Sequence, residues 1–513
     1  MTDRESFRPL DRRMITLSIM AATIMQTLDT TIANVALPHM QGAMSASQDQ
    51  IAWVLTSYIV AAAIATPLTG WLVDRFGQKA VFLASVIGFT VASALCGLSD
   101  SLAEIVAARL LQGVFGAALV PMSQVVLMDI NPPAKQGSAM AIWGVGVMVG
   151  PILGPTLGGW LTDSYSWRWV FFINIPVGIM TTYGIWKYIH PRPAARRVQF
   201  DLFGFAALSI AIGALQMLLD RGQQNDWFSS TETWIETITM SVAFTYFIAH
   251  TALTRADRSF LDYRLLKNRN YATGLMFIFI VGLVMYATRA LIPTMLEDLL
   301  DYPVTITGLV TAPSGIGTMA SMLLAGRILG KIDLRLILFC GFSITALSLY
   351  QMTGYSQDLS QSDIVWPGVI QGIGLGFVFV PLSTATFATL SPEMRAQGTA
   401  LFSLVRNIGS SIGISLVQAV LVHSTANAHA ALVERITYSN PAWTDPAIAS
   451  AYDLGRPSGA AALDALITAQ ASMIAYINDF RLMLYLTLAV IPLVLFVRIP
   501  GNGATAAAHA VMD

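Results

Sequence analysis

Residues 144 to 159 read GVGVMVGPILGPTLGG, an uncharged run in which two prolines lie inside an apolar segment. Glycines recur there at every fourth position, so on a helix they share one face and leave it almost bare of side chains. Another helix can therefore approach very closely. Each proline removes a backbone donor, which a packed membrane bundle tolerates because neighbouring groups satisfy the freed carbonyls. The pattern fits a generic packing face or a bendable contact between two moving halves of a transporter. The residues concerned are Gly146, Gly150, Pro151, Gly154, Pro155, Gly158 and Gly159.

The composition around this stretch indicates a polytopic membrane protein. Hydrophobic residues make up 55% of the 513 and charged residues only 12%, and the mean hydropathy is +0.62. Such a balance is far from that of soluble globular domains. The two cysteines lie far apart in apolar segments, so the sequence suggests neither a disulfide framework nor a metal site. It also has no nucleotide-binding or metalloprotease motif, so we expect neither an enzyme nor a bound cofactor.

A membrane-spanning helix needs about 20 mainly apolar residues. By that rule the sequence predicts an all-α protein with fourteen spans. Their approximate limits are 14–38, 50–73, 80–98, 103–126, 138–161, 169–189, 202–219, 234–253, 271–295, 305–328, 334–354, 364–387, 397–421 and 478–498. With the N-terminus in the cytoplasm, most of the 29 lysines and arginines fall on the cytoplasmic side, and an even number of spans places the C-terminus there too.

An internal repeat divides the chain into two related halves. Gln112-Gly113 with Ser123 in the fourth span is echoed by Gln371-Gly372 with Ser383 in the twelfth. Transporter folds are often built from such repeats. We therefore predict an N-terminal half at 1–190 and a C-terminal half at 271–499. Two inserted spans lie between them at 191–270, a periplasmic loop lies at about 423–477, and 500–513 form a cytoplasmic tail.

Asp29 is the only carboxylate expected well inside a span, and an ionisable residue there is a functional hypothesis by default. Burial favours the neutral form of a carboxylic acid and a neighbouring cation favours the ionised form, so a group under both influences can take and release a proton. Arg109 begins the fourth span at a depth comparable to that of Asp29. The sequence therefore predicts that these two residues handle protons, although a structural ion pair remains open.

Three arginines but one aspartate are expected inside the spans, which favours neutral or anionic amphipathic substrates over cations. Arg406 lies near the middle of the thirteenth span, and Arg289 lies in the outer half of the ninth, where it can also snorkel to the interface. Polar residues in the spans add candidates for a substrate cavity. The full set of cavity candidates is Gln26, Asn34, Gln112, Gln124, Arg289, Arg406 and Asn407.

The second span ends in GWLVDRFGQK, residues 70 to 79, at the cytoplasmic side. Glycine permits a tight turn, and the adjacent charges can form contacts that hold one conformation and break in another. A plain solvated loop is the simpler alternative. The predicted conformational switch comprises Gly70, Asp74, Arg75, Gly77 and Lys79.

Taken together, these stretches resemble the major facilitator superfamily and, within it, the fourteen-span drug:proton antiporters of the EmrB type. The resemblance rests on LDTTIANVALP (28–38), GWLVDRFGQK (70–79), RLLQG (109–113), GPILGPTLGG (150–159) and WRWVFFINIPVG (167–178). It implies a major facilitator fold in a bacterial inner membrane and export of hydrophobic toxic compounds in exchange for protons. It also implies a periplasmic adaptor of the EmrA type and an outer-membrane channel as partners. Asp29 and Arg109 match the proton-coupling positions of this family, whereas Arg289 departs from its pattern.

Three functions remain open at this point. The first is proton-coupled drug export by alternating access, driven by the proton gradient. The second is export of one endogenous metabolite or fatty-acid-like anion. The third is a receptor or assembly scaffold that transports nothing, against which the buried Asp29 and the glycine-rich stretch argue.

Overall fold

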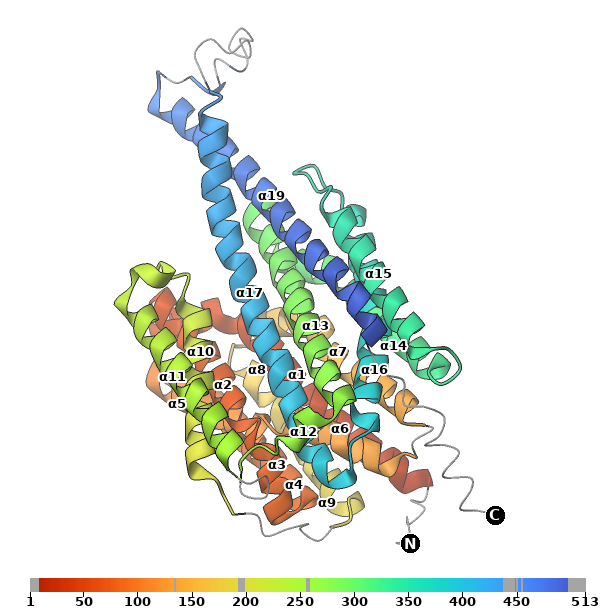
Figure 1. The fold of residues 1–513 in the computed structure, drawn as a ribbon. Helices are drawn as coiled ribbons and strands as arrows, with labels where there is room; N and C mark the ends of the chain where they lie inside the picture. The colour runs from red at the N-terminus through yellow and green to blue at the C-terminus, as the bar shows by residue number, and fades with distance from the viewer. Residues whose placement is uncertain are drawn as a thin grey trace.

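The structure, a computed structural model, describes residues 9–132, 135–191, 199–254, 259–436, 448, 451–453 and 455–496. The predicted tail at 500–513, most of the basic link near 190–200 and the centre of the outer loop lie outside the described residues. The described chain folds as a bundle of helices (Figure 1). This agrees with the all-α architecture expected from the length and spacing of the apolar segments.

The described part of the N-terminal half contains nine α-helices because two of its six expected spans are broken and one is preceded by a short turn of helix. The second span bends by 54° between α2 and α3, at Pro67, which cannot donate to the helix ladder. The helices are α1 (Pro9–Met44), α2 (Gln48–Ala65), α3 (Leu68–Phe76), α4 (Gln78–Leu98), α5 (Leu102–Gly116), α6 (Leu119–Ile130), α7 (Gln136–Ser164), α8 (Trp169–Phe172) and α9 (Asn174–Tyr188).

The inserted pair and the C-terminal half follow in the order predicted from the repeat. The inserted helices are α10 (Leu202–Arg221) and α11 (Thr231–Leu253), joined through η2 (Trp227–Ser229). The C-terminal half comprises α12 (Arg264–Lys267), α13 (Arg269–Thr294), η3 (Met295–Leu299), α14 (Val304–Ile328), α15 (Leu334–Met352), α16 (Gln361–Ala388), η4 (Pro392–Met394), α17 (Arg395–Val433), α19 (Pro457–Val490) and η6 (Ile491–Phe496).

Helices occupy all fourteen predicted span positions, but not all of them are long and apolar enough to cross a membrane. Within the described residues, twelve are long and apolar enough to cross a membrane, and the bent pair α2 and α3 makes a thirteenth. The exception is α11, at the predicted span 234–253. It has 23 residues but begins TETWIET, with several polar side chains in its first two turns. Length and apolar composition therefore support the fold and thirteen spans, and leave α11 as the least apolar candidate.

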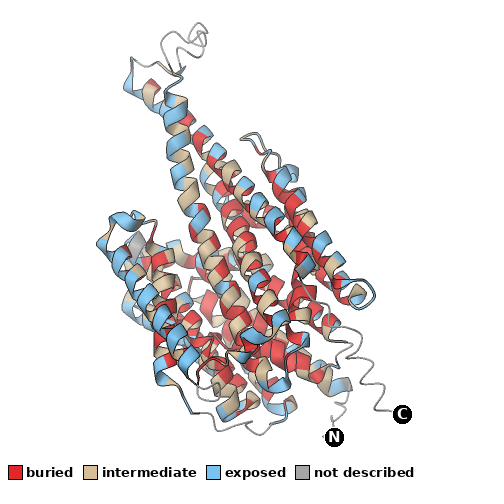
Figure 2. Ribbon diagram, in the orientation of Figure 1, coloured by how far each residue is buried: buried red, intermediate tan, exposed pale blue. Residues whose placement is uncertain are grey.

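The predicted outer loop at 423–477 is largely a helical hairpin. Helix α17 continues to Val433, well past the expected end of the thirteenth span, and α19 begins at Pro457 and runs without a break into the last span. The first half of α19 thus lies within the predicted loop. The hairpin projects beyond the rest of the molecule in Figure 1 and is mostly exposed or half-buried in Figure 2.

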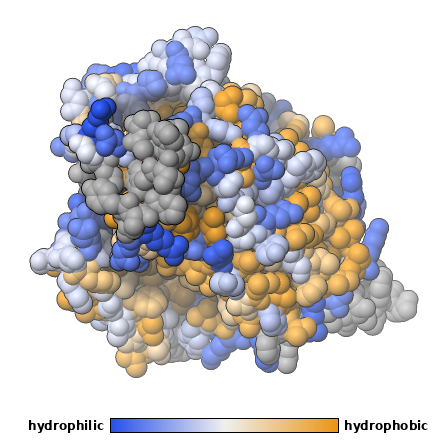
Figure 3. Space-filling view, turned by 90° about the horizontal axis from the view of Figure 1, so that it is seen from above, coloured by the Kyte–Doolittle hydropathy of each residue, from blue (hydrophilic) through white to orange (hydrophobic). Residues whose placement is uncertain are grey.

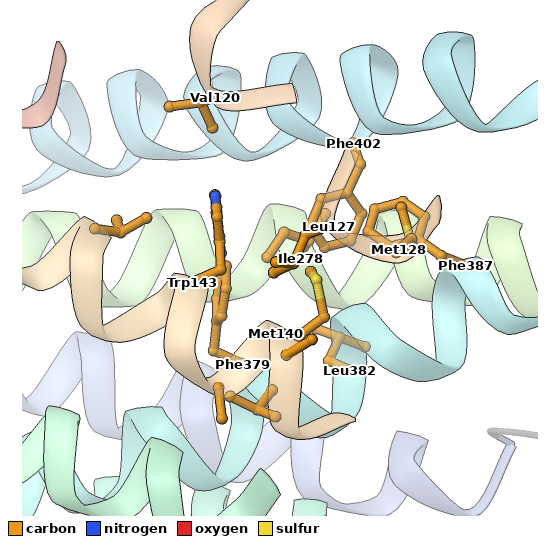
Figure 4. Close-up of a cluster of buried hydrophobic side chains, with 14 of the residues drawn as sticks. Val120, Leu127, Met128, Met140, Trp143, Ile278, Phe379, Leu382, Phe387 and Phe402 are labelled. Carbon is orange, nitrogen blue, oxygen red and sulfur yellow. The ribbon is translucent and has the colours of Figure 1, made fainter. Parts of the chain in front are cut away.

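A continuous apolar core joins the two halves near the end of the bundle where α1 begins. We call this end the cytoplasmic end, following the distribution of lysine and arginine. The core takes residues from α6 and α7 of the N-terminal half and from α13, α16 and α17 of the C-terminal half (Figure 4). Trp143 and Phe379 stack across the boundary with ring centroids 5.9 Å apart. Packing of this kind excludes water between the halves at the cytoplasmic end.

Candidate functional site

Asp29 and Arg109, which the sequence places at comparable depths, form a buried ion pair in the structure. The Arg109 Nη1 lies 2.8 Å from the Asp29 Oδ2, and both side chains are 1% exposed. The other carboxylate oxygen accepts hydrogen bonds from Gln112 Nε2 and Asn174 Nδ2, each at 2.8 Å. Donors from α5 and α9 therefore surround a carboxylate on α1, which satisfies its ionised form at a position buried from solvent.

Arg109 keeps further partners that do not depend on Asp29. Its Nε donates to the Val54 carbonyl at 3.1 Å and its Nη1 to Gln112 Oε1 at 2.9 Å. The guanidinium also lies over the Tyr58 ring, 4.6 Å from its centroid. Cation–π contacts are strongest where water is excluded. If Asp29 takes a proton, the arginine is thus still held, while the strongest bond between α1 and α5 is weakened.

The glycine face of α7 packs against α1, the helix that carries Asp29. Gly150 sits so close that an added Cβ would lie 2.5 Å from the backbone carbon of Thr27. The Thr31 hydroxyl donates to the Gly150 carbonyl at 3.0 Å. The next glycines of the face, Gly154 and Gly158, also meet α1, at Thr31 and Ile32. In contrast, Gly159 has open space where a Cβ would be.

This packing corrects one interpretation of the glycine-rich stretch, because its four-residue face lies within the N-terminal half. Contact between the halves comes from a neighbouring face of α7, which packs against α14. An added Cβ at Gly308 would lie 3.5 Å from Pro155 Cβ, and one at Gly326 would lie 2.6 Å from Ala141 Cβ. The Ser138 hydroxyl donates to the Gly326 carbonyl at 3.0 Å. Helix α7 therefore touches α1 with one face and the opposite half with another.

The predicted switch lies where α3 meets the start of α17. Gly77 has a φ of 83°, a value that favours glycine, and ends α3 before α4 begins. An added Cβ at Gly70 would lie 2.9 Å from the Cα of Gln397, so the two halves nearly touch there. Lys79 Nζ donates to the Trp186 carbonyl at 2.6 Å, within the N-terminal half. Asp74 is half-buried and Arg75 exposed.

An ion pair that the sequence did not predict crosses between the halves beside this switch. Arg395 Nη1 at the start of α17 lies 3.1 Å from Asp129 Oδ1 at the end of α6, and both side chains are less than one-fifth exposed. Gln78 Nε2 approaches the second oxygen of Asp129 at 3.5 Å. Together with the Trp143 and Phe379 stack, the pair closes the cytoplasmic end.

Arg289 and Arg406 line one small pocket between the halves, as part of the predicted cavity. The remaining walls come from Met148 on α7 and from apolar residues of α13, α14 and α16. Arg289 Nη2 lies 3.5 Å from Met148 Sδ, and Arg406 Nη2 lies 3.4 Å from the Asn407 oxygen. In the part of the chain that the structure describes, no acidic side chain forms a salt bridge with either arginine. The pocket thus combines an apolar wall with two positive charges.

The other predicted cavity residues are scattered. Gln112 belongs to the Asp29 cluster, and Gln26 donates to the Tyr58 hydroxyl at 3.2 Å beside it. Gln124 is fully buried on α6, and neither polar atom of its side chain has a partner among the described residues. Asn34 and Asn407 are exposed. Only Arg289 and Arg406 of this set line the pocket.

Two buried polar residues, Asn174 and Asp479, were not predicted from the sequence. Asn174 starts α9 and completes the Asp29 cluster. Its only signal was its place within the apolar stretch VFFINIPVG. Asp479 was expected at the border between the outer loop and the last span, yet it is 0% exposed within continuous α19. Neither of its carboxylate oxygens has a hydrogen-bond partner in the described residues. Asp29 is therefore not the only carboxylate deep in a span.

Comparison with known proteins agrees with this geometry. The profile of the Major Facilitator Superfamily matches residues 19–414. The chain belongs to this superfamily. Fatty acid resistance protein FarB of Neisseria gonorrhoeae is 38% identical over 424 residues, 82% of this chain and 83% of that protein. Multidrug export protein EmrB of Escherichia coli K12 is 37% identical over 430 residues, 83% and 84% of the two chains.

Solved structures support the same fold. The human organic anion transporter MFSD10 aligns with a TM-score of 0.58 at 15% identity, covering 94% of this chain and 100% of that one. A bacterial homologue of the lysosomal transporter Spinster, solved in an inward-facing conformation, aligns with a TM-score of 0.56 at 17% identity. The curated relatives place this superfamily member in the EmrB-type multidrug efflux branch, as the sequence motifs indicate. It is a multi-pass membrane transporter whose relatives include proteins named for multidrug export and for fatty acid resistance.

Proposed function

We propose that this superfamily member exports amphipathic toxic compounds across the inner membrane in exchange for protons, by alternating access. The observation that carries the proposal is the buried Asp29 carboxylate with its three side-chain donors. A carboxylate in a membrane span is costly and is kept for a function. Both chain termini would lie in the cytoplasm, and the proton gradient would supply the energy.

The packing of α1 gives a route from the proton to the movement of the halves. Protonation of Asp29 removes the negative charge that Arg109 meets at 2.8 Å. Helix α1 is then freer to shift against α5. Thr27 and Thr31 of α1 are in close contact with the glycine face of α7, so a movement of α1 would also move α7. Because α7 packs against α14, the movement would be passed on to the opposite half. The ion pair of Asp129 and Arg395 opens when the cytoplasmic end separates.

The test uses purified protein in liposomes with an imposed pH gradient. Asp29→Asn keeps the hydrogen-bonding shape but cannot exchange a proton, and we expect it to abolish gradient-driven export while substrate still binds. Asp100→Asn is the control, since Asp100 is 86% exposed in its pair with Arg168. Unchanged coupled export in Asp29→Asn would reject the role of Asp29. Absence of proton movement during export by the unaltered protein would reject proton coupling altogether.

We also propose that the helical hairpin of α17 and α19 contacts a periplasmic adaptor of the EmrA type, which would continue to an outer-membrane channel. The hairpin extends past the other helices and exposes Val433 and Leu466 at 43% and 40%. Seen from the hairpin end, the coloured part of this face carries both hydrophilic and hydrophobic side chains (Figure 3). Photo-crosslinkers at these two positions should capture the adaptor, whereas one at Phe76, on the cytoplasmic end, should not. Equal capture at all three positions would argue against the docking site.

A second candidate function is export of one amphipathic acid. The pocket with Arg289 and Arg406 favours it, because its two arginines have no acidic partner among the described residues and its other walls are apolar. Arg289→Leu should then lower export of a long-chain carboxylate and leave export of the matching alcohol unchanged. An unaltered ratio between the two compounds would count against the charge of this pocket as the basis of selection.

A further inference from the structure

An apolar groove of about 440 Å³ runs along the outside of the N-terminal half, between α4 and α9. Ile179, Tyr183 and Trp186 form one edge, at the helical spacing that places side chains on a single face of α9. Ile87 and Val91 of α4 form the other edge. All five are between 47% and 63% exposed. In a membrane-spanning bundle this surface meets the hydrocarbon of the bilayer rather than water.

The groove exists because a glycine lies at its floor. Gly178 packs so tightly against Thr90 of α4 that no side chain fits between the two helices. The Thr90 hydroxyl donates to the Val86 carbonyl at 2.7 Å, so it needs no partner from the groove. The floor is therefore low and apolar, and the large residues on either side stand above it. The volume lies in the range of small-ligand pockets, about 300–1,000 Å³.

Two lysines lie at the cytoplasmic mouth of the groove. Lys79 Nζ donates to the carbonyl of Trp186 at 2.6 Å. Lys187 Nζ lies 3.1 Å from the Tyr183 hydroxyl and 5.4 Å from the centre of its ring. Within the described residues, neither lysine forms a salt bridge with an acidic side chain. Each ammonium group thus keeps donors for an anion outside the protein.

The order of these features matches the cross-section of one membrane leaflet. From Trp186 at the mouth to Ile179, α9 rises about 10 Å, which is most of the hydrocarbon depth of one leaflet. Positive charge lies at the headgroup level, aromatic residues lie just below it, and aliphatic residues follow toward the membrane centre. Trp and Tyr are enriched at that interfacial level, and basic residues on the cytoplasmic side attract anionic lipids.

We propose that the groove between α4 and α9 binds an anionic phospholipid of the cytoplasmic leaflet. Its phosphate lies between Lys79 and Lys187, and one acyl chain lies along the groove over Gly178. A bound chain would fill the notch between α4 and α9 and hold the two helices together next to the turn at Gly77. This site is independent of proton coupling and of the pocket between the halves.

Native mass spectrometry of the delipidated full-length protein, titrated with phosphatidylglycerol or phosphatidylethanolamine, tests the site. The unaltered protein should bind phosphatidylglycerol more tightly. Lys187→Gln should weaken that binding about fivefold, the contribution of one surface lysine, and Lys187→Arg should preserve it. Lys331→Gln is the control, because Lys331 is an exposed lysine at the cytoplasmic end of the other half.

A second variant tests the groove without touching a charge. Ile87→Trp fills the groove and should lower binding of both lipids, whereas Val242→Trp, on the 64% exposed position of α11, should lower neither. Equal affinity for the two lipids in the unaltered protein, or unchanged binding in Lys187→Gln, would overturn the proposal. Displacement of phosphatidylglycerol by a transported amphipathic acid would also overturn it, because the groove would then be a substrate site.

Discussion

Replacing Gly150 with alanine tests whether the close contact between α1 and α7 is needed for transport. The added Cβ would lie 2.5 Å from the backbone carbon of Thr27, which is 0.9 Å short of the 3.4 Å at which ordinary van der Waals contact begins. Backbone cannot rotate away as a side chain can, so the helices must separate or slide by nearly that amount. Overpacking of this kind costs about 1–3 kcal/mol. The separation would also lengthen the 3.0 Å bond from the Thr31 hydroxyl to the Gly150 carbonyl.

The strain from the methyl group added in Gly150→Ala should slow turnover more than it weakens substrate binding. If α1 and α7 must slide during the transport cycle, about 1.4 kcal/mol placed on one of the two conformations changes their ratio tenfold. The pocket at Arg289 and Arg406 lies between the halves, but Val147 and Met148 are its only residues from α7 and its two arginines come from α13 and α17, so its affinity should change less than the turnover rate. We expect turnover in liposomes to fall about tenfold in Gly150→Ala, and the dissociation constant of a fluorescent substrate to change less than about threefold.

Gly159→Ala is the matched control because it adds the same methyl group to the same helix where nothing lies within 4 Å. It should transport at the normal rate. Normal turnover in Gly150→Ala would refute the idea that close contact with α1 matters for the cycle. Weaker substrate binding, together with a normal export rate at saturating substrate, would refute the inference that the contact of α7 with α1 sets the transport rate while the pocket sets the affinity.

Two further predictions concern the buried charges. Asp129→Asn leaves Arg395 partly buried without its 3.1 Å ion pair. Labelling, from the cytoplasmic side, of cysteines introduced between the halves should therefore rise more than about tenfold, and exchanging Asp129 and Arg395 with each other should restore protection. Labelling that neither change affects would exclude a role of this pair in closing the cytoplasmic end. Asp479→Leu should leave the thermal unfolding temperature unchanged or raise it, because no described residue loses a hydrogen-bond partner. Asp29→Leu should lower that temperature, because it leaves the buried Arg109 charge without its ion pair. A lower unfolding temperature for Asp479→Leu than for Asp29→Leu would contradict this argument.

The sequence made a pair of Asp29 and Arg109 plausible, because the membrane restricts the alternatives, but it could not show that their helices touch. Charges inside hydrocarbon must find partners, and counting helical turns from the membrane surface gave both residues the same depth. Asn174 could not be found in this way. A neutral amide near the start of a span resembles any interfacial polar residue, and its place beside Asp29 depends on how α9 packs against α1.

The glycine face of α7 shows a different limit. Its spacing identified a bare helix face, and the structure has close contacts along that face. The spacing carries no information on which helix fills it, and the neighbour proved to be α1 rather than a helix of the other half. Periodicity describes one helix, whereas the identity of a neighbour is a property of the whole bundle.

Asp479 and the hairpin were missed for a common reason. Hydropathy marks where a helix leaves the membrane but not where it stops being a helix. Neither α17 near residue 421 nor α19 near residue 478 has a proline or a glycine that would end it there. Hydropathy therefore predicts a loop at about 423–477 and puts Asp479 at the very start of the last span, whereas Asp479 lies inside the packed part of α19.

The position of α1 between α5 and α7 makes it the element through which a proton and the movement of the halves would be coupled. Its Asp29 is bound by donors on α5 and α9, while Thr27 and Thr31, two residues to either side, face the glycines of α7. A shift of α1 large enough to release the carboxylate must therefore also change its contact with Gly150. If instead the proton acted only by altering Arg109, Gly150→Ala would leave the proton dependence of export intact and reduce only its rate. A shifted pH profile in Gly150→Ala, with Gly159→Ala unchanged, is the result that the packing of α1 requires.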